Sequence, residues 1–442
     1  MRRMQGEYRR HMRSGIHIPV VLRYLDRTLN TDTLNISASG MGLRRTPEAD
    51  IEPGETVSVV VRDCPDLSIV AKVTYVGAAR IGLNFQRVPL SDQELSRVYL
   101  SAPRWQRLSV WVKRSAWSGG RRLAVFTANT LLRALILKWV RPRFIFAAYG
   151  TQRQAATYYS PSLARFMPLN LILGYIRHQD MRGLMVAPQY LEHELQSEPP
   201  KVRHYIEQLQ RDFRGAERIA LVGRLPNFVK KAEIEIDSPL VEGSRGTRFM
   251  LWDVARALRR RPQYLEHDSI VVLGGAGRIG SAVCRDIARL YAKVLAFDPR
   301  YTEEEEVETG DGILLRTANP ERLADQRLYI ALTQNGDEVL ELGPYIPSGS
   351  LIADDTHPCI DFDARTELEQ HGISVEKTVL SHNEFSMWPR MPAWNNRDIP
   401  GCLVEALVLL HHPELTDNDF IAFCHEAERL GFAGRLVEPL DD

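Results

Sequence analysis

The sequence predicts a protein of several domains, in which a small β-barrel precedes an α/β region built on a doubly wound parallel sheet. Residues 17–88 alternate between apolar and polar side chains with the two-residue period of strands, and turn signals such as Pro53-Gly54 separate the runs. From residue 245 onward, apolar strand-like runs alternate with helical segments, which is the pattern of a parallel sheet with crossover helices. A glycine-rich turn at residues 274–280 joins one of these strands to a helix.

Composition is that of a globular protein, but charge is distributed unevenly. The chain has 442 residues, 44% hydrophobic and 25% charged, with a formal net charge of zero. Between Glu94 and Asp180 there is no acidic residue, whereas 14 lysines and arginines occur there. A cationic block of this length should attract anionic partners by long-range steering.

The cysteines and the apolar segments indicate the cellular compartment in which we expect the protein. The five cysteines show no paired spacing, which favours a reducing environment, and we predict no metal site. The basic start is not followed by an apolar run, so we expect no signal peptide. The stretch most like a membrane span, residues 123–140, contains Asn129, Arg133 and Lys138, and a charge at mid-bilayer costs ~2.5–3.5 kcal/mol. We therefore expect a cytoplasmic protein.

Two polar motifs flank the first predicted strand. Two arginines four residues apart precede it, and an Asn-x-Ser-x-x-Gly pattern follows after 21 intervening residues. Guanidinium groups bind phosphate oxygens and guanine edges bidentately and stack on purines, and a glycine permits a turn or a close backbone approach. The candidate ligand-binding residues are Arg9, Arg10, Arg13, Asn35, Ser37 and Gly40.

This pair of motifs resembles the signatures of the PilZ family. The resemblance implies a barrel over residues 1–100 that binds cyclic di-GMP, with Arg9 and Arg13 clamping the ligand and the second motif lining the rim of the barrel. The alternative is a basic tail that precedes a barrel without a ligand.

The glycine-rich turn has the context of a dinucleotide site. The strand over 269–274 precedes the Gly-x-Gly-x-x-Gly pattern, a helix follows from Arg278, and Asp298 ends the next strand. The glycines allow a tight turn and close packing, and the helix N-terminus offers N–H groups to phosphates. The predicted cofactor-binding residues are Gly275, Gly277, Arg278, Ile279, Gly280 and Asp298.

This region therefore predicts a Rossmann-type domain that binds NAD or NADP. Asp298 would accept hydrogen bonds from the ribose 2′-hydroxyl and repel a 2′-phosphate, which favours NAD, although Arg300 lies nearby. The alternative is a degenerate domain that no longer binds a cofactor.

Cys402 is the candidate nucleophile. It follows Pro400 at the start of an apolar helix, where free N–H groups and the helix dipole favour a thiolate. The alternative is a small core residue, because free cysteines are often buried.

Residues 219–440 resemble the long-chain acyl-carrier-protein reductases, which reduce fatty acyl thioesters to aldehydes. The stretches that carry the resemblance are Ala220–Gly223, Glu242–Thr247, Gly277–Cys284, Cys402–Ala406 and Glu426–Phe432. The resemblance implies that Cys402 accepts the acyl group and that an acyl carrier protein or acyl-CoA delivers it. Asp298 departs from that family, and the strand over 294–299 also looks like that of D-2-hydroxyacid dehydrogenases.

Three functions remain open at this point. The first is cyclic di-GMP-regulated, NAD(P)H-dependent reduction of an acyl thioester, with His357 and His382 as candidate proton donors. The second is an NAD-dependent dehydrogenase of a small hydroxy or amino acid without covalent catalysis. The third is a non-catalytic cyclic di-GMP effector that uses the Rossmann domain as a sensor or scaffold.

The predicted organisation has five parts. They are a barrel at 1–100, a cationic helical connector at 101–149, a substrate or catalytic α/β domain at 150–245, a dinucleotide-binding domain at 246–412, and a C-terminal helix at 413–442 that packs on the substrate domain. Residues 104–143 combine basic side chains with tryptophans, which is typical of interfacial helices. They predict interdomain packing, carrier-protein docking or peripheral contact with the inner membrane, and we expect no nucleic-acid partner.

Overall fold

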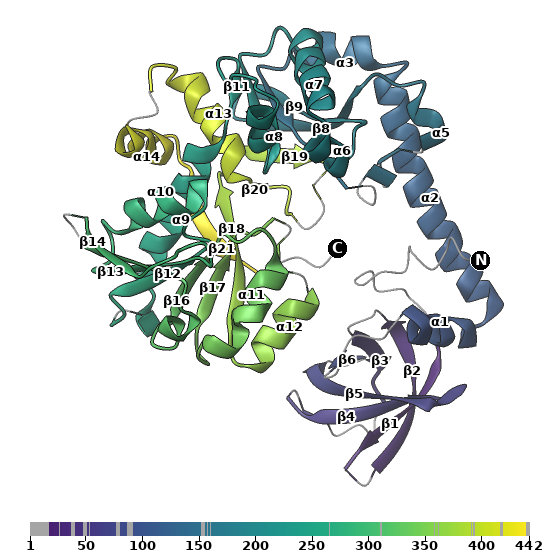
Figure 1. Cartoon of the computed structure of the whole chain (residues 1–442). Helices are drawn as coiled ribbons and strands as arrows, with labels where there is room; N and C mark the ends of the chain where they lie inside the picture. The colour runs from purple at the N-terminus through teal and green to yellow at the C-terminus, as the bar shows by residue number, and fades with distance from the viewer. Residues whose placement is uncertain are drawn as a thin grey trace. The chain divides into compact units, whose positions relative to one another are not determined.

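The chain forms two compact units in the computed structural model (Figure 1). The units are Met1–Gly120 with Asp441–Asp442, and Arg121–Leu440. The structure describes residues 17–25, 27–36, 40–46, 51–52, 54–76, 80–85, 92–151, 155–156, 158–159, 161–264, 266–309, 312–357, 359–360, 362–389, 391, 394–415 and 419–438.

The first unit is a closed six-stranded antiparallel barrel with the order β1-β2-β3-β6-β5-β4, as predicted. Its strands are β1 (Pro19–Tyr24), β2 (Arg27–Ile36), β3 (Gly40–Arg44), β4 (Thr56–Val61), β5 (Cys64–Val76) and β6 (Arg80–Phe85). Alternate side chains of β6, namely Ile81, Leu83 and Phe85, point into the core, because successive residues of a strand face opposite sides. Helices α1 (Asp92–Ser101) and α2 (Arg104–Asn129) follow the barrel in the chain.

The second unit contains two sheets, and the smaller one has six strands in the order β11-β10-β7-β9-β8-β19. Its strands are β7 (Phe144–Ala147), β8 (Asn170–His178), β9 (Met181–Pro188), β10 (Arg218–Leu221), β11 (Leu240–Val241) and β19 (Phe385–Trp388). The helices of this region are α3 (Arg133–Val140), α5 (Pro161–Ala164), α6 (Glu192–Ser197), α7 (Pro199–Asp212) and α8 (Leu225–Lys231). Strands β11, β10, β7 and β9 are parallel, so their carboxyl ends lie at one edge.

The larger sheet has nine strands, with the order β14-β15-β13-β12-β16-β17-β18-β20 and β21 paired to β18. The strands are β12 (Ser269–Leu273), β13 (Lys293–Phe297), β14 (Glu305–Glu308), β15 (Ile313–Thr317), β16 (Leu328–Ala331), β17 (Leu351–Asp354), β18 (Ser374–Ser381), β20 (Asp398–Ile399) and β21 (Ala433–Val437). The helices are α9 (Ser244–Leu258), α10 (Arg278–Ile287), α11 (Gly336–Leu342), α12 (Phe362–Gln370), α13 (Gly401–His411) and α14 (Phe420–Arg429), with short 3₁₀ turns at Pro262–Tyr264, Pro320–Leu323 and Gly343–Tyr345.

The central strands of the larger sheet are apolar throughout because helices cover both faces. Ile270 and Val272 of β12 belong to the core that contains side chains of α9, α10 and α13. Val271 and Leu273 belong to the core that contains side chains of α11 and α12. Figure 1 shows these two helical layers on opposite faces of the sheet, which is the doubly wound arrangement that the sequence predicts.

Three segments differ from the predicted organisation. Residues 144–147, expected within a helical connector, form β7 inside the six-stranded sheet. Strand β19, expected in the dinucleotide domain, pairs with β8 of the other sheet. The end of the chain, expected to be a helix on the substrate domain, forms α14 and then β21, which pairs with β18 of the nine-stranded sheet. These pairings give hydrogen-bond partners to backbone groups that would otherwise be unpaired at a sheet edge. The periodicity of the sequence does not show which strand will pair with which.

Candidate dinucleotide and thiol site

The glycine-rich turn leaves no room for side chains. Gly274 has a φ of +85°, and the N–H groups of Gly274 and Gly275 donate to Phe297 O at 2.9 and 3.0 Å. A Cβ on Gly280 would lie 2.2 Å from Gly274 O, and a Cβ on Gly275 would lie 2.8 Å from the Cβ of Ala296. Glycine is therefore required for the backbone to pass from β12 into α10 this tightly.

The turn lies where dinucleotides bind in sheets of this kind. Strand β12 pairs with β13 on one side and β16 on the other, so the chain reverses its direction of travel across the sheet at this point. Helix α10 begins at Arg278, and Arg278, Ile279 and Gly280 line a cleft outside the carboxyl ends of the strands. The N–H groups of a first helical turn lack partners within the helix and can bind phosphate.

Asp298 lies beside this turn and is held by several donors. Its carboxylate accepts hydrogen bonds from the backbone N–H groups of Ala276 and Arg300, each at 3.0 Å, and from the Arg300 guanidinium at 2.8 and 2.9 Å. Burial alone would raise the pKa of Asp298, but these hydrogen bonds and the charge of Arg300 outweigh it and hold the pKa below its usual value. The carboxylate is therefore ionised and close to the turn.

One cleft of about 620 Å³ collects residues from both sheets. The nine-stranded sheet contributes the glycine-rich turn, Asp298 and the loops after β16 and β17. The six-stranded sheet contributes the loops after β10 and β11, including Gly223 and Gly243. Cys402 lines the same cleft, so the structure brings the candidate nucleophile and the predicted dinucleotide site together.

Cys402 lies in the first turn of α13, as predicted, but in more crowded surroundings. A Cβ on Gly243, where φ is +83°, would lie 2.5 Å from the Cβ of Cys402. Burial raises the pKa of the Cys402 thiol to about 12, and this effect outweighs the backbone N–H of Gly223, which favours the thiolate. Burial therefore favours the thiol form, whereas the helix position favours the thiolate.

A buried ion pair fixes the start of α13 against the start of α9. Glu405 accepts hydrogen bonds from the backbone N–H of Arg245 at 2.7 Å and from its Nε at 3.2 Å, and both side chains are almost fully buried. A Cβ on Gly246 would lie 2.1 Å from Gly401 O. The stretches Glu242–Thr247 and Cys402–Ala406 are therefore neighbours in space, and their contacts position Cys402.

Asp355 is a functional candidate that sequence reasoning missed. It follows β17 directly, lines the cleft, and accepts a hydrogen bond from Thr378 Oγ1 at 3.1 Å. Burial raises its pKa to about 7, and its charge acts on the Cys402 thiol. Its place immediately after a parallel strand was the signal available in the sequence.

The two candidate histidines have different surroundings. His357 lines the cleft, and its side chain is exposed there. His382 is not among the residues that line the cleft. Its Nδ1 accepts from Glu384 N at 3.1 Å, and its Nε2 contacts Leu430 O at 2.9 Å. Both ring nitrogens of His382 are thus used in holding the backbone.

Glu242 connects the two edges of the cleft. It forms ion pairs with Lys230 and, at 2.8 Å, with Arg278 of the glycine-rich turn, and it accepts a hydrogen bond from Ser244 Oγ at 2.9 Å. Burial would raise the pKa of Glu242, but these partners outweigh it and lower the pKa. The carboxylate thus pairs with Arg278 at the glycine-rich turn.

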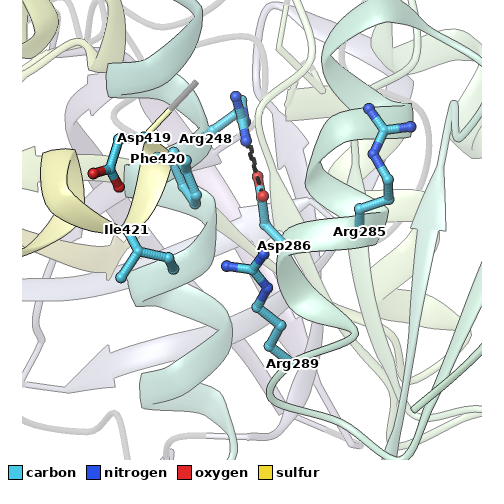
Figure 2. A pocket seen from close by; sticks show the side chains of 7 residues that line it. All are labelled: Arg248, Arg285, Asp286, Arg289, Asp419, Phe420 and Ile421. Atoms are coloured by element: carbon cyan, nitrogen blue, oxygen red, sulfur yellow. Dashed lines mark hydrogen bonds and ion pairs between the residues drawn. The ribbon is translucent and has the colours of Figure 1, made fainter. Parts of the chain in front are cut away.

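A second hollow, of about 380 Å³, lies among α9, α10 and α14 (Figure 2). Arg248 pairs with Asp286 at 2.8 and 2.9 Å and lies over the ring of Phe420 at 4.0 Å. None of its lining residues lines the larger cleft. Arg285 and Arg289 also line this hollow.

The barrel motifs are described only in part. Asn35 is the next-to-last residue of β2, beside a bulge, and its Oδ1 accepts a hydrogen bond from Gly42 N at 3.2 Å. A Cβ on Gly40 would lie 2.5 Å from Leu83 O, so glycine allows β3 and β6 to approach closely. The remaining predicted ligand residues, Arg9, Arg10, Arg13 and Ser37, lie outside the described residues.

A family model matches the first part of the chain. Residues 7–102 match the family model of the PilZ domain. A search of curated proteins finds no match. Because the family model covers the first part of the chain only, it leaves the activity of the second unit open.

Solved structures show distant likenesses. The chain is similar to the PilZ domain of CeSA from a cellulose synthesizing bacterium, with 19% identity, a TM-score of 0.18, and coverage of 21% of this chain and 95% of that chain. It is similar to a dipicolinate synthase from Bacillus halodurans, with 18% identity, a TM-score of 0.25, and coverage of 38% of this chain and 60% of that chain. It is similar to L-tryptophan dehydrogenase from Nostoc punctiforme, with 13% identity, a TM-score of 0.31, and coverage of 56% and 68%. Likenesses this distant do not indicate an activity.

Proposed function

We propose that this protein is a cyclic di-GMP-responsive oxidoreductase that uses a reduced nicotinamide dinucleotide to convert a fatty acyl thioester into an aldehyde. The observation that carries the proposal is that Cys402 and the glycine-rich turn line the same cleft. A nucleophile and a hydride donor must meet at one carbon in such a reaction, and separate sites would exclude it.

The residues of the cleft fit a dinucleotide. The glycines form a cradle that any Cβ would fill, and the first turn of α10 offers backbone N–H groups to a pyrophosphate. Asp298 would accept hydrogen bonds from the adenosine ribose, which favours NAD over NADP. A reduced nicotinamide, when bound, supplies a hydride.

The chain's own residues supply the covalent step. Cys402 Sγ attacks the thioester carbonyl, the new S–C bond replaces the bond to the carrier sulfur, and the carrier leaves as a thiol. Since the pKa of Cys402 is high, a base must remove its proton, and Asp355, with a pKa near 7 in the same cleft, is the candidate. In the net change, thioester, NAD(P)H and one proton give aldehyde, free thiol and NAD(P)⁺.

One observation favours a competing function. Because the Cys402 thiol is protonated at neutral pH, a direct dehydrogenase of a hydroxy or amino acid could use Asp355 or His357 for proton transfer without a covalent intermediate. A Cys402→Ala variant separates the two, since only the covalent route requires the sulfur.

The regulatory part of the proposal rests on the PilZ match over residues 7–102. We assign cyclic di-GMP binding to Arg9, Arg10, Arg13, Asn35, Ser37 and Gly40. Calorimetry on the full chain should show saturable binding that Arg9→Ala/Arg13→Ala abolishes, whereas Arg23→Ala, an exposed arginine on β1, should leave it unchanged. If the barrel is folded and calorimetry shows neither heat nor saturation, the assignment is contradicted.

The catalytic part is tested by following absorbance of NADH and NADPH with palmitoyl-CoA or a palmitoyl carrier protein, with and without cyclic di-GMP. The expected result is oxidation of the cofactor with stoichiometric aldehyde and a rate that changes with cyclic di-GMP. Tight cofactor binding without aldehyde would refute acyl reduction, and no cofactor binding at all would favour a non-catalytic effector.

A further inference from the structure

Large apolar side chains are exposed together where α2 ends and α3 begins. This corner of the second unit lies at the junction of α2 and α3 in Figure 1. The exposed residues and their exposed fractions are Leu123 at 64%, Leu131 at 77%, Leu132 at 43%, Leu135 at 62% and Trp139 at 75%. So many exposed apolar residues within 17 consecutive positions exceed the scattered exposure that is ordinary on a soluble surface.

The corner is firmly attached to the six-stranded sheet on its other side. The Asn129 side chain accepts from Ile172 N at 2.7 Å and donates to Ile172 O at 3.0 Å. Arg133 donates to Asn170 O at 2.7 Å and pairs with Asp212 at 3.0 Å. The apolar side chains are therefore displayed by a fixed scaffold, and they do not result from a loosely packed helix.

The exposed charged side chains next to Trp139 in the chain are positive. Lys138 and Arg141 are exposed beside Trp139, and the Arg182 guanidinium lies 5.7 Å from the Trp139 ring and donates to Trp139 O at 3.2 Å. The sequence has no acidic residue from Arg97 to Arg177. Tryptophan and basic residues around an apolar patch are the composition of segments that lie at the surface of an anionic bilayer.

The geometry indicates a segment that lies on a bilayer and does not cross it. Among the described residues, no single helix is long and apolar enough to span a membrane. The pair Gly119–Asn129 and Arg133–Val140 meets the length and composition limits together, but it bends by 75°. Its inner face is bonded to the sheet through Asn129 and Arg133, so only the outer face is available to lipid.

We propose that the corner formed by residues 121–141 docks on the surface of a bilayer that contains anionic lipids. Leu131, Leu135 and Trp139 enter the boundary between headgroups and acyl chains, while Lys138 and Arg141 contact the headgroup phosphates. The proposal is independent of the reaction catalysed in the cleft.

Flotation of the full chain with vesicles tests the proposal. The vesicles are phosphatidylcholine alone, or phosphatidylcholine with phosphatidylglycerol. We expect the protein to float with the mixed vesicles and much less with the neutral ones. Leu131→Gln/Leu135→Gln should reduce the bound fraction by about tenfold or more, because burial of these two side chains drives insertion. Lys138→Gln/Arg141→Gln should reduce binding to the mixed vesicles by several-fold and remove the preference for them.

The matched control is Trp388→Gln on β19. Trp388 is about as exposed as Leu131 but lies outside the corner, so this change should leave flotation unchanged. Wild-type protein that stays unbound with both vesicles, or bound protein that is insensitive to Leu131→Gln/Leu135→Gln, would overturn the proposal. Sedimentation without vesicles tests whether a second copy of the chain binds to this face instead. A wild-type dimer that Leu131→Gln/Leu135→Gln converts to a monomer would assign this face to a second copy of the chain and would also overturn it.

Discussion

The two sheets of the second unit contribute to one cleft by different means. The nine-stranded sheet presents the backbone of the turn after β12, which has glycines where a side chain would collide, together with the side chains of Asp298 and Asp355. The six-stranded sheet presents Gly243, in close contact with Cys402, and Glu242, which pairs with Arg278. We expect phosphates and a ribose at the first edge, and the second edge encloses the Cys402 thiol.

The glycine-rich edge of the cleft is easier to predict from the sequence than the edge around Cys402. The glycine-rich turn and Asp298 lie within 25 residues, in an order that reflects local backbone geometry. The surroundings of Cys402 depend on the pair Arg245 and Glu405, which are separated by 160 residues. Contacts over such distances are fixed by tertiary packing, which no local pattern encodes.

The largest expected effect is that of removing the sulfur. Cys402→Ala should lower acyl-thioester turnover by about 10³-fold or more, because the covalent step is lost. The Kd for NADH, measured by fluorescence titration, should stay within about twofold, since the glycine-rich edge is unchanged. Retained turnover would assign the chemistry to direct hydride transfer.

The next effect concerns the glycine-rich edge alone. Gly280→Val should weaken NADH binding by about 100-fold or more, because its Cβ would lie 2.2 Å from Gly274 O and displace the turn. The control Gly215→Ala, at an exposed position where a Cβ meets no atom within 4 Å, should bind normally. Equal affinity in both variants would show that the turn does not hold the cofactor.

Asp355 tests the proton path beside Cys402. Asp355→Asn should reduce turnover by about 10²-fold and remove the fall in rate that we expect for wild-type protein below about pH 7. Burial raises the pKa of Asp355, so its ionised form is less favourable in the folded state than in the unfolded state, and wild-type stability falls as pH rises from 4 through 7. The variant should therefore have a higher free energy of unfolding than wild type at pH 8, by about 2 kcal/mol in denaturant unfolding. A rate profile unchanged by the substitution would exclude Asp355 as the base.

The smallest effect lies where the two sheets meet. His178 at the end of β8 is fully buried between His382 and Phe432, with ring centroids at 4.6 and 5.1 Å, and neither ring nitrogen has a hydrogen-bond partner among the described residues. Burial lowers its pKa to about 3, so unfolded chains take up a proton below pH 6.5 that the folded state excludes. Wild-type protein should lose about 2 kcal/mol of stability from this group between pH 7 and pH 5.

A His178→Phe variant should show a smaller loss over that range, measured by urea unfolding at each pH. His371→Gln, which alters an exposed histidine directly after α12, is the control. The same acid dependence in His178→Phe and wild type would show that His178 is not the responsible group.

Much of the fold could be predicted from the sequence, and the reasons are local. Strands β12, β13, β16 and β17 are short, mainly apolar runs, and their alternation with helices predicts a parallel sheet. The pairing of β19 with β8 and of β21 with β18 could not be predicted, because no pattern in the sequence of β19 or β21 indicates which strand it pairs with. The high pKa of Cys402 was missed for the same reason, since it results from packing against segments far away in the sequence.

The central claim is that Cys402 and a nicotinamide dinucleotide act on one carbon in one cleft. Intact-mass measurement tests it most directly, on protein incubated with palmitoyl-CoA, before and after addition of NADH or NADPH. We expect an acyl adduct that peptide mapping places on Cys402 and that disappears with aldehyde release once the reduced cofactor is added. Cofactor binding without any adduct, or an adduct that persists in the presence of both cofactors, would contradict the claim.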